Sequence, residues 1–460
     1  MKKIIAAIVC AALATNSVIY YPTSASAAEP AGQTEKTAVS DSVSMTSVTG
    51  PYKYVSGAAN PVISRNVPAY SGTSYNPSAG NDDFYYSLWN ASPEDYLAYD
   101  LSAVPAQQKK TVIAVWYNLS SYDSIGQYIS CNAEPIDYTI EVNSAAGGSY
   151  PETGWEIAET IENNGYSSRQ HVINMEGYNW IRVNVTKAAG NTINLNFDIH
   201  DVSEGISDSW IFFGDSITAG GVNNAYGTGF ATFINKLDPR YFPVQENGGI
   251  GGITSTDGKQ NIDKWLSTSP AKYVSIAYGT NDAWGNPGNT QKYYDNTKYM
   301  IDAVLQSGKT PVLPKIPSST NPDVGPNIGY YNAMIDKLYS EYGDKLVKGP
   351  DFESFFNDNP EYLSSDGVHP NSEGYEAMRS FWAETMYKNV YSSAADTVKH
   401  DVNMDNAFNV EDIVLVERYM LNVPDTTLSD WEAANFNEND KLDVYDLCMM
   451  KNALLKSFES

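Results

Sequence analysis

Cysteine is scarce in this sequence, which excludes a fold held together by several disulfides. Only three cysteines occur among the 460 residues, at Cys10, Cys131 and Cys448. Cys10 lies in an N-terminal apolar run, and we expect the other two to belong to different domains. Their spacing therefore predicts neither a disulfide between them nor a cysteine-based metal site.

Basic residues are also few in relation to acidic ones. Lys and Arg together number 29, against 55 Asp and Glu, and the formal net charge is −26 at pH 7. Such a surface repels phosphate backbones and anionic head groups. The charge argues against nucleic acid and membranes as partners. It fits an uncharged substrate, and it leaves carboxylates available for a cation.

Long apolar runs are absent after the N-terminus. Lys2 and Lys3 precede an apolar run over residues 4–14, and the small residues 25–27 follow it. A run of this length is too short to span a bilayer. The layout is typical of a secretory signal peptide, which we place at residues 1–27, so we expect a secreted, extracellular protein.

Alternating apolar and polar residues characterise the next part of the chain. Residues 28–50 are rich in Ser, Thr, Ala and Val without periodicity, and we predict a flexible linker there. Apolar residues then occupy every second position over 136–142, 181–185 and 193–199. This period is typical of half-buried strands. We predict an N-terminal all-β sandwich over residues 51–205.

The sequence leaves the function of the predicted sandwich open. One interpretation is carbohydrate binding, because tryptophan offers a flat face to a sugar ring. The candidate platforms are Trp89, Trp116, Trp155 and Trp180. The alternative is that these side chains fill the core and that the sandwich braces the following domain.

Strand and helix patterns alternate over residues 206–392. We expect strands at 210–213, 272–277 and 310–313, and helices at 291–306, 330–342 and 371–390. Alternation at these lengths predicts βαβ units, and therefore a parallel sheet with helices on both faces. Catalytic groups of open α/β sheets lie at the carboxyl ends of the strands.

Four short motifs follow strands of this second domain. They are Gly214-Asp215-Ser216, Asn247-Gly248-Gly249-Ile250-Gly251-Gly252, Gly279-Thr280-Asn281-Asp282 and Asp366-Gly367-Val368-His369. A serine hydroxyl becomes a good nucleophile only when a base accepts its proton. The other three histidines of the chain lie outside this domain, at His171, His200 and His400. His369 is therefore the predicted base for Ser216, and Asp366 is expected to hold its second ring nitrogen.

Ester hydrolysis also requires hydrogen-bond donors for the oxygen that becomes negative. We predict the backbone N–H groups of Ser216 and Gly252 and the side-chain amide of Asn281. Gly252 fits this role because a backbone N–H approaches a substrate closely where no side chain intrudes. Tyr278 and Trp284 flank the Asn281 motif. They are candidates for lining an acyl or sugar pocket, and core packing is equally consistent with the sequence.

The C-terminal part contains an internal repeat of oxygen-bearing side chains. Asp401, Asn403, Asp405, Asn409 and Asp412 occupy positions 1, 3, 5, 9 and 12 of a loop, and Asn435, Asn437, Asn439, Asp443 and Asp446 repeat the spacing 34 residues later. Oxygen ligands at these offsets suit Ca²⁺, and Ala407 and Lys441 offer backbone carbonyls. The second loop begins with Asn435 and carries fewer charges, so we expect it to bind calcium more weakly.

The four motifs resemble the four blocks of the SGNH (GDSL-like) hydrolase family. The resemblance covers the domain at 206–392 and implies a flavodoxin-like three-layer α/β fold and a Ser-His-Asp mechanism without a catalytic cofactor. After a short linker at 393–398, residues 399–460 resemble a type I dockerin. That resemblance implies a small α-helical module with paired calcium loops and a cohesin domain of a scaffoldin as partner.

Together these features predict a secreted, cellulosomal carbohydrate esterase that removes O-acetyl groups from plant cell-wall polysaccharide. Acetyl xylan is the first expected substrate, followed by acetyl mannan or rhamnogalacturonan. One alternative is an SGNH lipase or lysophospholipase, which would need a long apolar acyl groove. A second alternative is a non-catalytic carbohydrate-binding scaffold subunit.

Overall fold

The computed structural model describes most of the chain after residue 58. The described residues are 42–43, 59–82, 84–85, 87–117, 133–206, 208–222, 228–285, 287–392, 400–403, 405, 407–424, 426–428, 430–436 and 441–457. The predicted signal peptide (1–27), the linker at 393–398 and Cys131 lie outside these residues. Within the predicted linker at 28–50, Ser42 and Val43 form strand β1, which pairs with strand β7 (Glu156–Ile161). That dipeptide is therefore a strand and not linker, because its backbone completes one edge of a sheet.

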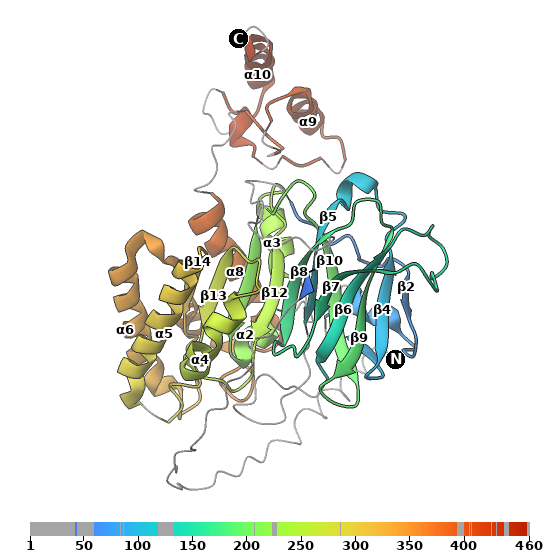
Figure 1. Ribbon diagram of the computed structural model, residues 1–460. Coiled ribbons are helices and arrows are strands. Elements are labelled where there is room, and N and C mark those ends of the chain that lie inside the picture. Colours follow the sequence, from blue (N-terminus) through green and yellow to red (C-terminus); the bar gives the residue numbers. More distant parts are fainter. Residues whose placement is uncertain are drawn as a thin grey trace, which may run out of the picture. The chain divides into compact units, whose positions relative to one another are not determined.

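Two antiparallel sheets form the first part of the fold (Figure 1). The six-stranded sheet has the order β1-β7-β6-β9-β4-β2, with β2 at Ala69–Ser71, β4 at Asp95–Asp100, β6 at Pro135–Asn143 and β9 at Trp180–Ala188. The four-stranded sheet has the order β3-β10-β5-β8, with β3 at Trp89–Ala91, β5 at Thr111–Tyr117, β8 at Ser168–Asn174 and β10 at Ile193–Asp201. The strands predicted from alternation correspond to β6, β9 and β10.

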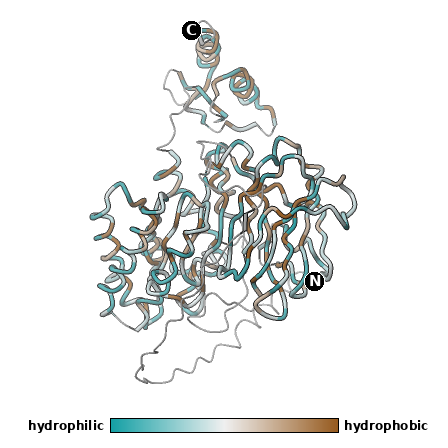
Figure 2. The backbone as a smooth tube through the Cα atoms, in the orientation of Figure 1, coloured by the Kyte–Doolittle hydropathy of each residue, from teal (hydrophilic) through white to brown (hydrophobic). Residues whose placement is uncertain are grey.

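One hydrophobic cluster draws its side chains from both antiparallel sheets. Leu97, Ile140 and Val183 come from the six-stranded sheet, and Leu195 and Phe197 from the four-stranded sheet. Figure 2 shows that hydrophobic segments lie along these strands. Burial of this apolar surface is the main favourable contribution to the folding free energy of the part of the chain that forms the two antiparallel sheets, the N-terminal module.

Three of the four tryptophans considered as sugar platforms are in the core. Trp89, Trp116 and Trp180 have 0% of their surface exposed. Trp155 is half-buried, and the guanidinium of Arg182 lies 4.2 Å from the centre of its ring. The platform interpretation is therefore wrong for the first three, because a ring enclosed by protein offers no face to a ligand.

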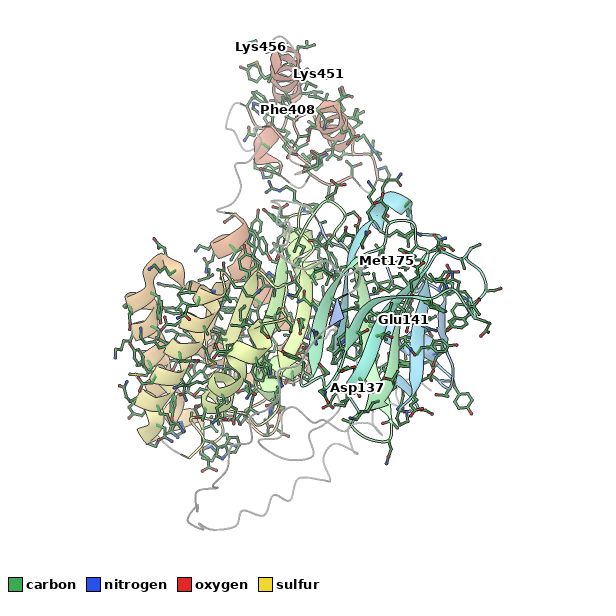
Figure 3. All side chains as sticks on the ribbon, viewed as in Figure 1. Asp137, Glu141, Met175, Phe408, Lys451 and Lys456 are labelled. Atoms are coloured by element: carbon green, nitrogen blue, oxygen red, sulfur yellow. The ribbon has the colours of Figure 1, made fainter. Side chains whose placement is uncertain are left out.

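Polar side chains of the six-stranded sheet also form a cluster. Glu141, labelled in Figure 3, accepts hydrogen bonds from Arg182 Nε at 2.7 Å and from Asn184 Nδ2 at 3.0 Å. Asp137, also labelled there, accepts from the backbone N–H of Asn163 at 2.7 Å. These contacts satisfy carboxylates on strand β6, in which apolar and polar residues alternate.

A parallel five-stranded sheet organises the second part of the chain. Its order is β12-β11-β13-β14-β15, with β11 at Ser209–Gly214, β12 at Val244–Gly249, β13 at Tyr273–Ala277, β14 at Thr310–Lys315 and β15 at Val347–Asp351. The helices are α2 (Ser216–Val222), α3 (Phe230–Leu237), α4 (Ser255–Leu266), α5 (Thr290–Gln306), α6 (Gly325–Tyr342), α7 (Phe352–Asp358) and α8 (Ser372–Met386), which continues as a π-helical turn over Tyr387–Tyr391. Short 3₁₀ turns lie at Pro77–Gly80, Ala106–Gln108, Pro287–Asn289, Gly343–Lys345, Pro360–Tyr362 and Glu432–Ala434.

The side chains of β11 explain why this strand is a continuous apolar run. Ile211 and Phe213 belong to the hydrophobic cluster that includes α4, α5 and α6, whereas Trp210 and Phe212 belong to the cluster with α3 and α8. Both faces of the strand are therefore covered by helices, as in other buried parallel sheets. The predicted parallel sheet with helices on both faces is confirmed.

The strand order places a topological switch at β11. The chain passes from β11 to β12 on one side and then returns to β13 on the other side. Open α/β sheets bind ligands at the carboxyl end of the strands where this reversal occurs. Ser216 begins α2 at that end of β11.

A buried carboxyl group links the antiparallel part to the parallel sheet. Glu246 of β12 accepts hydrogen bonds from Ser168 Oγ at 2.7 Å and from Gln170 Nε2 at 3.0 Å, both on β8. Burial raises the pKa of Glu246 to about 7, although these hydrogen bonds act in the opposite direction. The folded protein therefore holds a proton on Glu246 more tightly than the unfolded chain does.

Replacing Glu246 with Gln is expected to flatten the pH dependence of stability. A carboxyl group whose pKa is higher in the folded state contributes stability at low pH that is lost as the pH rises through the folded pKa. The loss is up to about 1.4 kcal/mol per pH unit between the two pKa values. Thermal unfolding at pH 5 to 7 should show a shallower decline for Glu246→Gln than for the wild type. The exposed Glu361→Gln is the control, and parallel curves for Glu246→Gln and wild type would contradict the prediction.

The C-terminal part contains two further helices, α9 (Val410–Met420) and α10 (Val444–Ser457). A small hydrophobic cluster joins them through Val402, Ile413, Val416 and Met450. Phe408, labelled in Figure 3, packs against this cluster. Cys448 on α10 is exposed and free. Among the described residues, no helix is long and apolar enough to cross a lipid bilayer.

Candidate active site

The structure brings Ser216, His369 and Asp366 together in one chain of hydrogen bonds. Ser216 Oγ lies 2.7 Å from His369 Nε2, although the two residues are 153 positions apart. His369 Nδ1 lies 2.6 Å from Asp366 Oδ2. One ring nitrogen can therefore accept the hydroxyl proton while the other donates to the carboxylate.

The environment of Asp366 keeps it ionised. Burial opposes ionisation, but hydrogen bonds from His369, Val368 and Ser364 lower the pKa of Asp366 to about 2. Its Oδ1 accepts from Ser364 Oγ at 2.7 Å and from the backbone N–H groups of Val368 at 2.8 Å and His369 at 3.0 Å. Asp366 is thus fixed as an acceptor that can stabilise a positively charged imidazole ring.

A second loop, which follows β14, holds the loop of His369 in place. The Gly367 carbonyl accepts from the Thr320 backbone N–H at 2.9 Å and from Ser319 Oγ at 2.6 Å. Asn321 Nδ2 donates to the Asp366 carbonyl at 3.2 Å. Gly367 has a φ of 71°, where glycine is favoured, and an added Cβ would lie 2.5 Å from Thr320 Oγ1. Residues 317–322 consist of Pro, Ser, Thr and Asn, a composition that indicates a loop. This composition does not reveal that the loop forms hydrogen bonds to the Gly367 carbonyl.

The glycines of the Asn247–Gly252 motif serve two separate purposes. Gly249 belongs to β12, and a Cβ there would lie 2.3 Å from the backbone nitrogen of Ala219. The absence of a side chain therefore lets α2 pack directly on the strand. Gly252 has a φ of 77°, which turns the chain after the strand in a conformation that side chains rarely allow.

The predicted oxyanion donors Gly252 and Asn281 are on adjoining loops. Asn281 Nδ2 donates to the carbonyl of Ile253 at 2.9 Å. The amide group has two N–H bonds, so this contact leaves one for a ligand. Asp282 fixes the arrangement, because its carboxylate accepts from the backbone N–H of Ser255 at 2.9 Å.

The two aromatic residues that flank Asn281 differ in their surroundings. Tyr278 is only 3% exposed, and its ring packs against Gly258 on α4, where a Cβ would lie 2.7 Å from the ring. The structure therefore places Tyr278 in the core instead of on an accessible wall. Trp284 is 41% exposed and stays a prediction for substrate contact.

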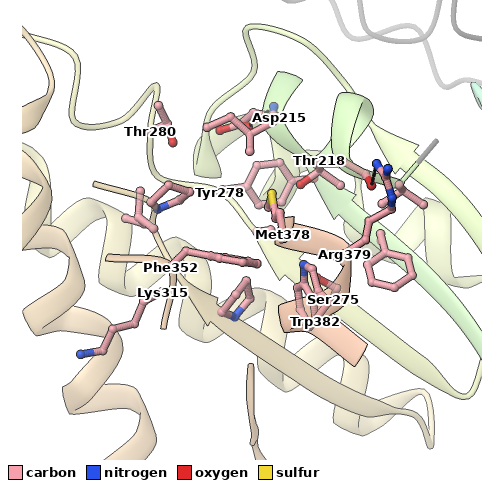
Figure 4. A pocket seen from close by; sticks show the side chains of 18 of the residues that line it. Asp215, Thr218, Ser275, Tyr278, Thr280, Lys315, Phe352, Met378, Arg379 and Trp382 are labelled. Carbon is pink, nitrogen blue, oxygen red and sulfur yellow. Dashed lines mark hydrogen bonds between the residues drawn. The ribbon is translucent and has the colours of Figure 1, made fainter. Parts of the chain in front are cut away.

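A small internal cavity lies beneath α2 (Figure 4). Its volume is about 30 Å³, and its lining includes Phe212, Phe352, Met378 and Trp382. The lining does not include Ser216 or His369. A volume of this size holds about one water molecule.

Asp215 shapes the turn that carries the serine. Its Oδ1 accepts from the backbone N–H of Ile217 at 3.0 Å, as expected for a residue that fixes a turn. Burial raises the pKa of Asp215 to about 7, partly offset by the hydrogen bond from Ile217 and by the charge of His369.

The catalytic side of the sheet is open to solvent. The side chains of His369 and Asp366 are 38% and 49% exposed. Both side chains are therefore accessible to a ligand from the solvent.

The described parts of the two loops of the C-terminal repeat share the same closing hydrogen bonds. Asp412 accepts from the backbone N–H groups of Val402 at 3.0 Å and Asn409 at 2.9 Å. The equivalent bonds to Asp446 come from Phe436 at 2.9 Å and Asp443 at 3.0 Å. Each loop is thus closed by the acidic residue at its twelfth position.

The residues present fit a calcium ion held mainly by Asp and Asn oxygens. The first loop contributes Asp401, Asn403, Asp405, Asn409, Asp412 and the Ala407 carbonyl, and Asp405 N–H donates to Asp401 Oδ1 at 3.1 Å. In the second loop Asn437 and Asn439 lie outside the described residues, whereas Asn435, Lys441, Asp443 and Asp446 lie within them. Within the described ranges, no three His, Cys, Asp or Glu side chains form a metal cluster, so the amide and carbonyl oxygens are needed to complete such a site.

Comparison with known proteins supports both parts of this description. Residues 212–377 match the GDSL-like lipase/acylhydrolase family, and residues 399–455 match the type I dockerin domain. A multidomain esterase from Ruminococcus flavefaciens is 25% identical over 232 residues, which cover 45% of this chain and 29% of that protein. An arylesterase from Vibrio mimicus is 26% identical over 198 residues, covering 40% of this chain and 90% of that protein.

A solved structure described as an acetyl xylan esterase is also similar to this chain. It has 24% identity and a TM-score of 0.32, and the match covers 40% of this chain and 99% of that structure. The family matches coincide with the parallel-sheet domain that carries Ser216 and with the helices that follow the repeated loops. The chain thus contains a domain of the GDSL-like lipase/acylhydrolase family, followed by a type I dockerin domain.

Proposed function

We propose that this protein is a secreted serine esterase that removes short acyl groups, above all O-acetyl groups, from plant cell-wall polysaccharide. The observation that carries the proposal is the hydrogen-bonded series Ser216–His369–Asp366 at the switch point of the parallel sheet. Membership of the GDSL-like family supports the class of reaction, which is hydrolysis of a carboxylic ester.

The geometry supports a two-step mechanism. His369 Nε2 accepts the proton of Ser216 as Oγ bonds to the carbonyl carbon, and Asp366 stabilises the imidazolium that forms. The tetrahedral intermediate then releases the alcohol, whose oxygen takes the proton from His369. In the second step water gives a proton to His369 while its oxygen attacks the acyl-serine, and the carboxylic acid leaves as Ser216 regains its proton.

The oxyanion donors complete this proposed mechanism. The backbone N–H groups of Ser216 and Gly252 and the free N–H of Asn281 would face the carbonyl oxygen as it becomes negative. Each such donor contributes roughly 3 kcal/mol to the stability of the transition state. None of these steps uses a metal ion or a cofactor.

Two observations favour an acetylated polysaccharide as substrate. The side chains of His369 and Asp366 are open to solvent, which suits a polymeric alcohol. The net charge of −26 fits an uncharged polymer better than an anionic lipid. Acetyl xylan is the first candidate, with acetyl mannan and rhamnogalacturonan next. The charge of the chain favours the first two over rhamnogalacturonan, whose galacturonate units are anionic.

Release of acetate from a panel of acetylated polysaccharides tests the proposal. We expect acetate from at least one of acetyl xylan, acetyl mannan and acetylated rhamnogalacturonan. We also expect far higher activity on 4-nitrophenyl acetate than on 4-nitrophenyl palmitate. Preference for palmitate would instead favour the lipase or lysophospholipase alternative. Absence of hydrolysis of every ester would favour the non-catalytic scaffold subunit.

The dockerin domain supports a place on an extracellular, cellulosome-type complex. We propose that residues 399–460 bind a cohesin domain of a scaffoldin and that calcium bound to the two loops stabilises them. This location brings the esterase close to other enzymes that act on the same polysaccharide. We also propose that the two antiparallel sheets form a β-sandwich over residues 51–205, since one hydrophobic cluster contains side chains of both.

Calcium is expected to stabilise the dockerin through both loops. A ligand that binds only the folded state adds about 2.7 kcal/mol at 100 times its dissociation constant. Calcium should therefore raise the unfolding temperature of this part, and EDTA should reverse the effect. The variant Asp412→Ala should lose most of the gain, whereas Glu417→Gln, outside the loops, should retain it. Calorimetric titration should show tighter binding at the first loop, and earlier filling of the second loop would contradict its weaker predicted affinity.

A further inference from the structure

A groove on the N-terminal module has the composition of a site for uncharged sugars. It is lined by residues 73–76 after β2, by Leu88 and residues 90–92 around β3, and by Asn191 and Thr192 before β10. Its volume is about 480 Å³, within the usual range for small-molecule sites. All its lining residues belong to the antiparallel sheets and their loops, and none belongs to the hydrolase domain.

The uncharged side chains that line the groove can both donate and accept hydrogen bonds. Asn76, Asn90 and Asn191 offer amide donors and acceptors, and Thr73 and Ser92 offer hydroxyl groups. Among the described residues, none that lines the groove carries a charge. The chain as a whole contains 55 acidic residues, so an uncharged polar surface of this size is a distinct local feature.

Tyr75 supplies an aromatic face at the edge of this groove. Its side chain is fully exposed, the highest exposure recorded for a large hydrophobic residue in the described part of the chain. A tyrosine ring combines a flat apolar face with a polar tip, and such residues are favoured where a ligand has both apolar and hydroxyl surfaces. A pyranose ring has this character, because its C–H groups and its hydroxyl groups lie in different directions.

The loop that carries Tyr75 is fixed by one buried carboxylate. Asp95 accepts hydrogen bonds from Ser71 Oγ at 3.0 Å, from Gly72 N–H at 2.8 Å and from Thr73 N–H at 2.8 Å. Trp89 Nε1 donates to the same Ser71 oxygen at 3.0 Å. A loop held this firmly loses little conformational entropy when a ligand binds.

We propose that the groove formed by residues 73–76, 88, 90–92 and 191–192 binds uncharged polysaccharide, with Tyr75 stacking on a sugar ring. The site differs from the tryptophan platforms considered from the sequence, since three of those rings are buried. It would hold the polymer near the esterase independently of the ester group that Ser216 attacks.

Native affinity electrophoresis tests this proposal with deacetylated polymers. Xylan, glucomannan and mixed-linkage β-glucan without acetyl groups carry no ester, so retention does not depend on the proposed hydrolysis. We expect at least one of them to retard the wild-type chain, and polygalacturonate, which is anionic, to leave it unretarded. Tyr75→Ala should weaken retention about tenfold, as loss of a central aromatic contact does.

Tyr330→Ala is the matched control, because Tyr330 is an exposed tyrosine on helix α6 of the hydrolase domain. It should be retained like the wild type. Asn90→Ala provides a second groove variant and should also weaken retention. All variants should hydrolyse 4-nitrophenyl acetate at the wild-type rate. Equal retention of Tyr75→Ala and Tyr330→Ala, or no retention of the wild type by any neutral polymer, would overturn the proposal without affecting the proposed esterase activity.

Discussion

Replacing Ser216 with alanine is expected to lower kcat on 4-nitrophenyl acetate by about 10⁴-fold or more. The variant lacks the oxygen that forms the acyl-enzyme, and His369 then has no proton to accept from it. Loss of a nucleophile of this type commonly reduces kcat by factors of this size, with residual activity from the oxyanion donors. Hydrolysis rates of purified Ser216→Ala and wild type on the same ester provide the measurement.

The losses in kcat caused by replacing Ser216 and His369 should not add. His369→Ala is expected to cost about as much as Ser216→Ala, and the double variant should be no slower than either, because the two side chains act as one unit. Ser267→Ala, at the exposed end of α4, is the control for serine replacement and should retain wild-type activity. Comparable activity of Ser216→Ala and Ser267→Ala would remove Ser216 as nucleophile.

The sequence predicted the parallel-sheet domain well because its signals are local. Trp210 to Phe213 form an apolar run that requires cover on both faces, and the structure supplies it from two helical layers. The motif of Ser216 lies at the carboxyl end of β11, as expected. The motif of Asp366 was expected to follow a strand directly, and this is wrong, because α7 and the 3₁₀ turn Pro360–Tyr362 lie between β15 and Asp366. Only one histidine remained once His171, His200 and His400 were set aside, and that histidine lies beside Ser216.

Other features depend on contacts between distant segments, and no local pattern in the sequence indicates them. Trp116 is enclosed by strands of two sheets, so its burial depends on packing and not on its neighbours in the chain. Glu246 lies in β12, yet its partners Ser168 and Gln170 lie on β8. The loop at 317–322 is recognisable as a loop, but its bonds to Gly367 follow only from the fold.

Asn281→Ala should give the second large effect, a decrease in kcat of about 10²- to 10³-fold with little change in KM. Its free amide N–H is expected to bond to the substrate oxygen most strongly when that oxygen is negative. Removal of one such donor costs about 2.7–4 kcal/mol of transition-state stabilisation. An interaction specific to the transition state lowers kcat and kcat/KM together, which distinguishes it from simple loss of substrate binding.

The hydrogen bond from Asn281 to the Ile253 carbonyl requires a structural control. Asn327 on α6 is a suitable match, because its Nδ2 donates a hydrogen bond of 2.8 Å to the carbonyl of Ala283. Ala283 is two residues after Asn281 in the same segment. Asn327→Ala removes a side-chain bond to the same segment without removing an oxyanion donor, so its kcat should fall by less than about tenfold. If Asn327→Ala and Asn281→Ala lower kcat equally, Asn281 acts by holding its loop. If Asn281→Ala raises KM at constant kcat, the amide binds the substrate in its ground state. Either of these two results would show that the assignment of Asn281 as an oxyanion donor is wrong.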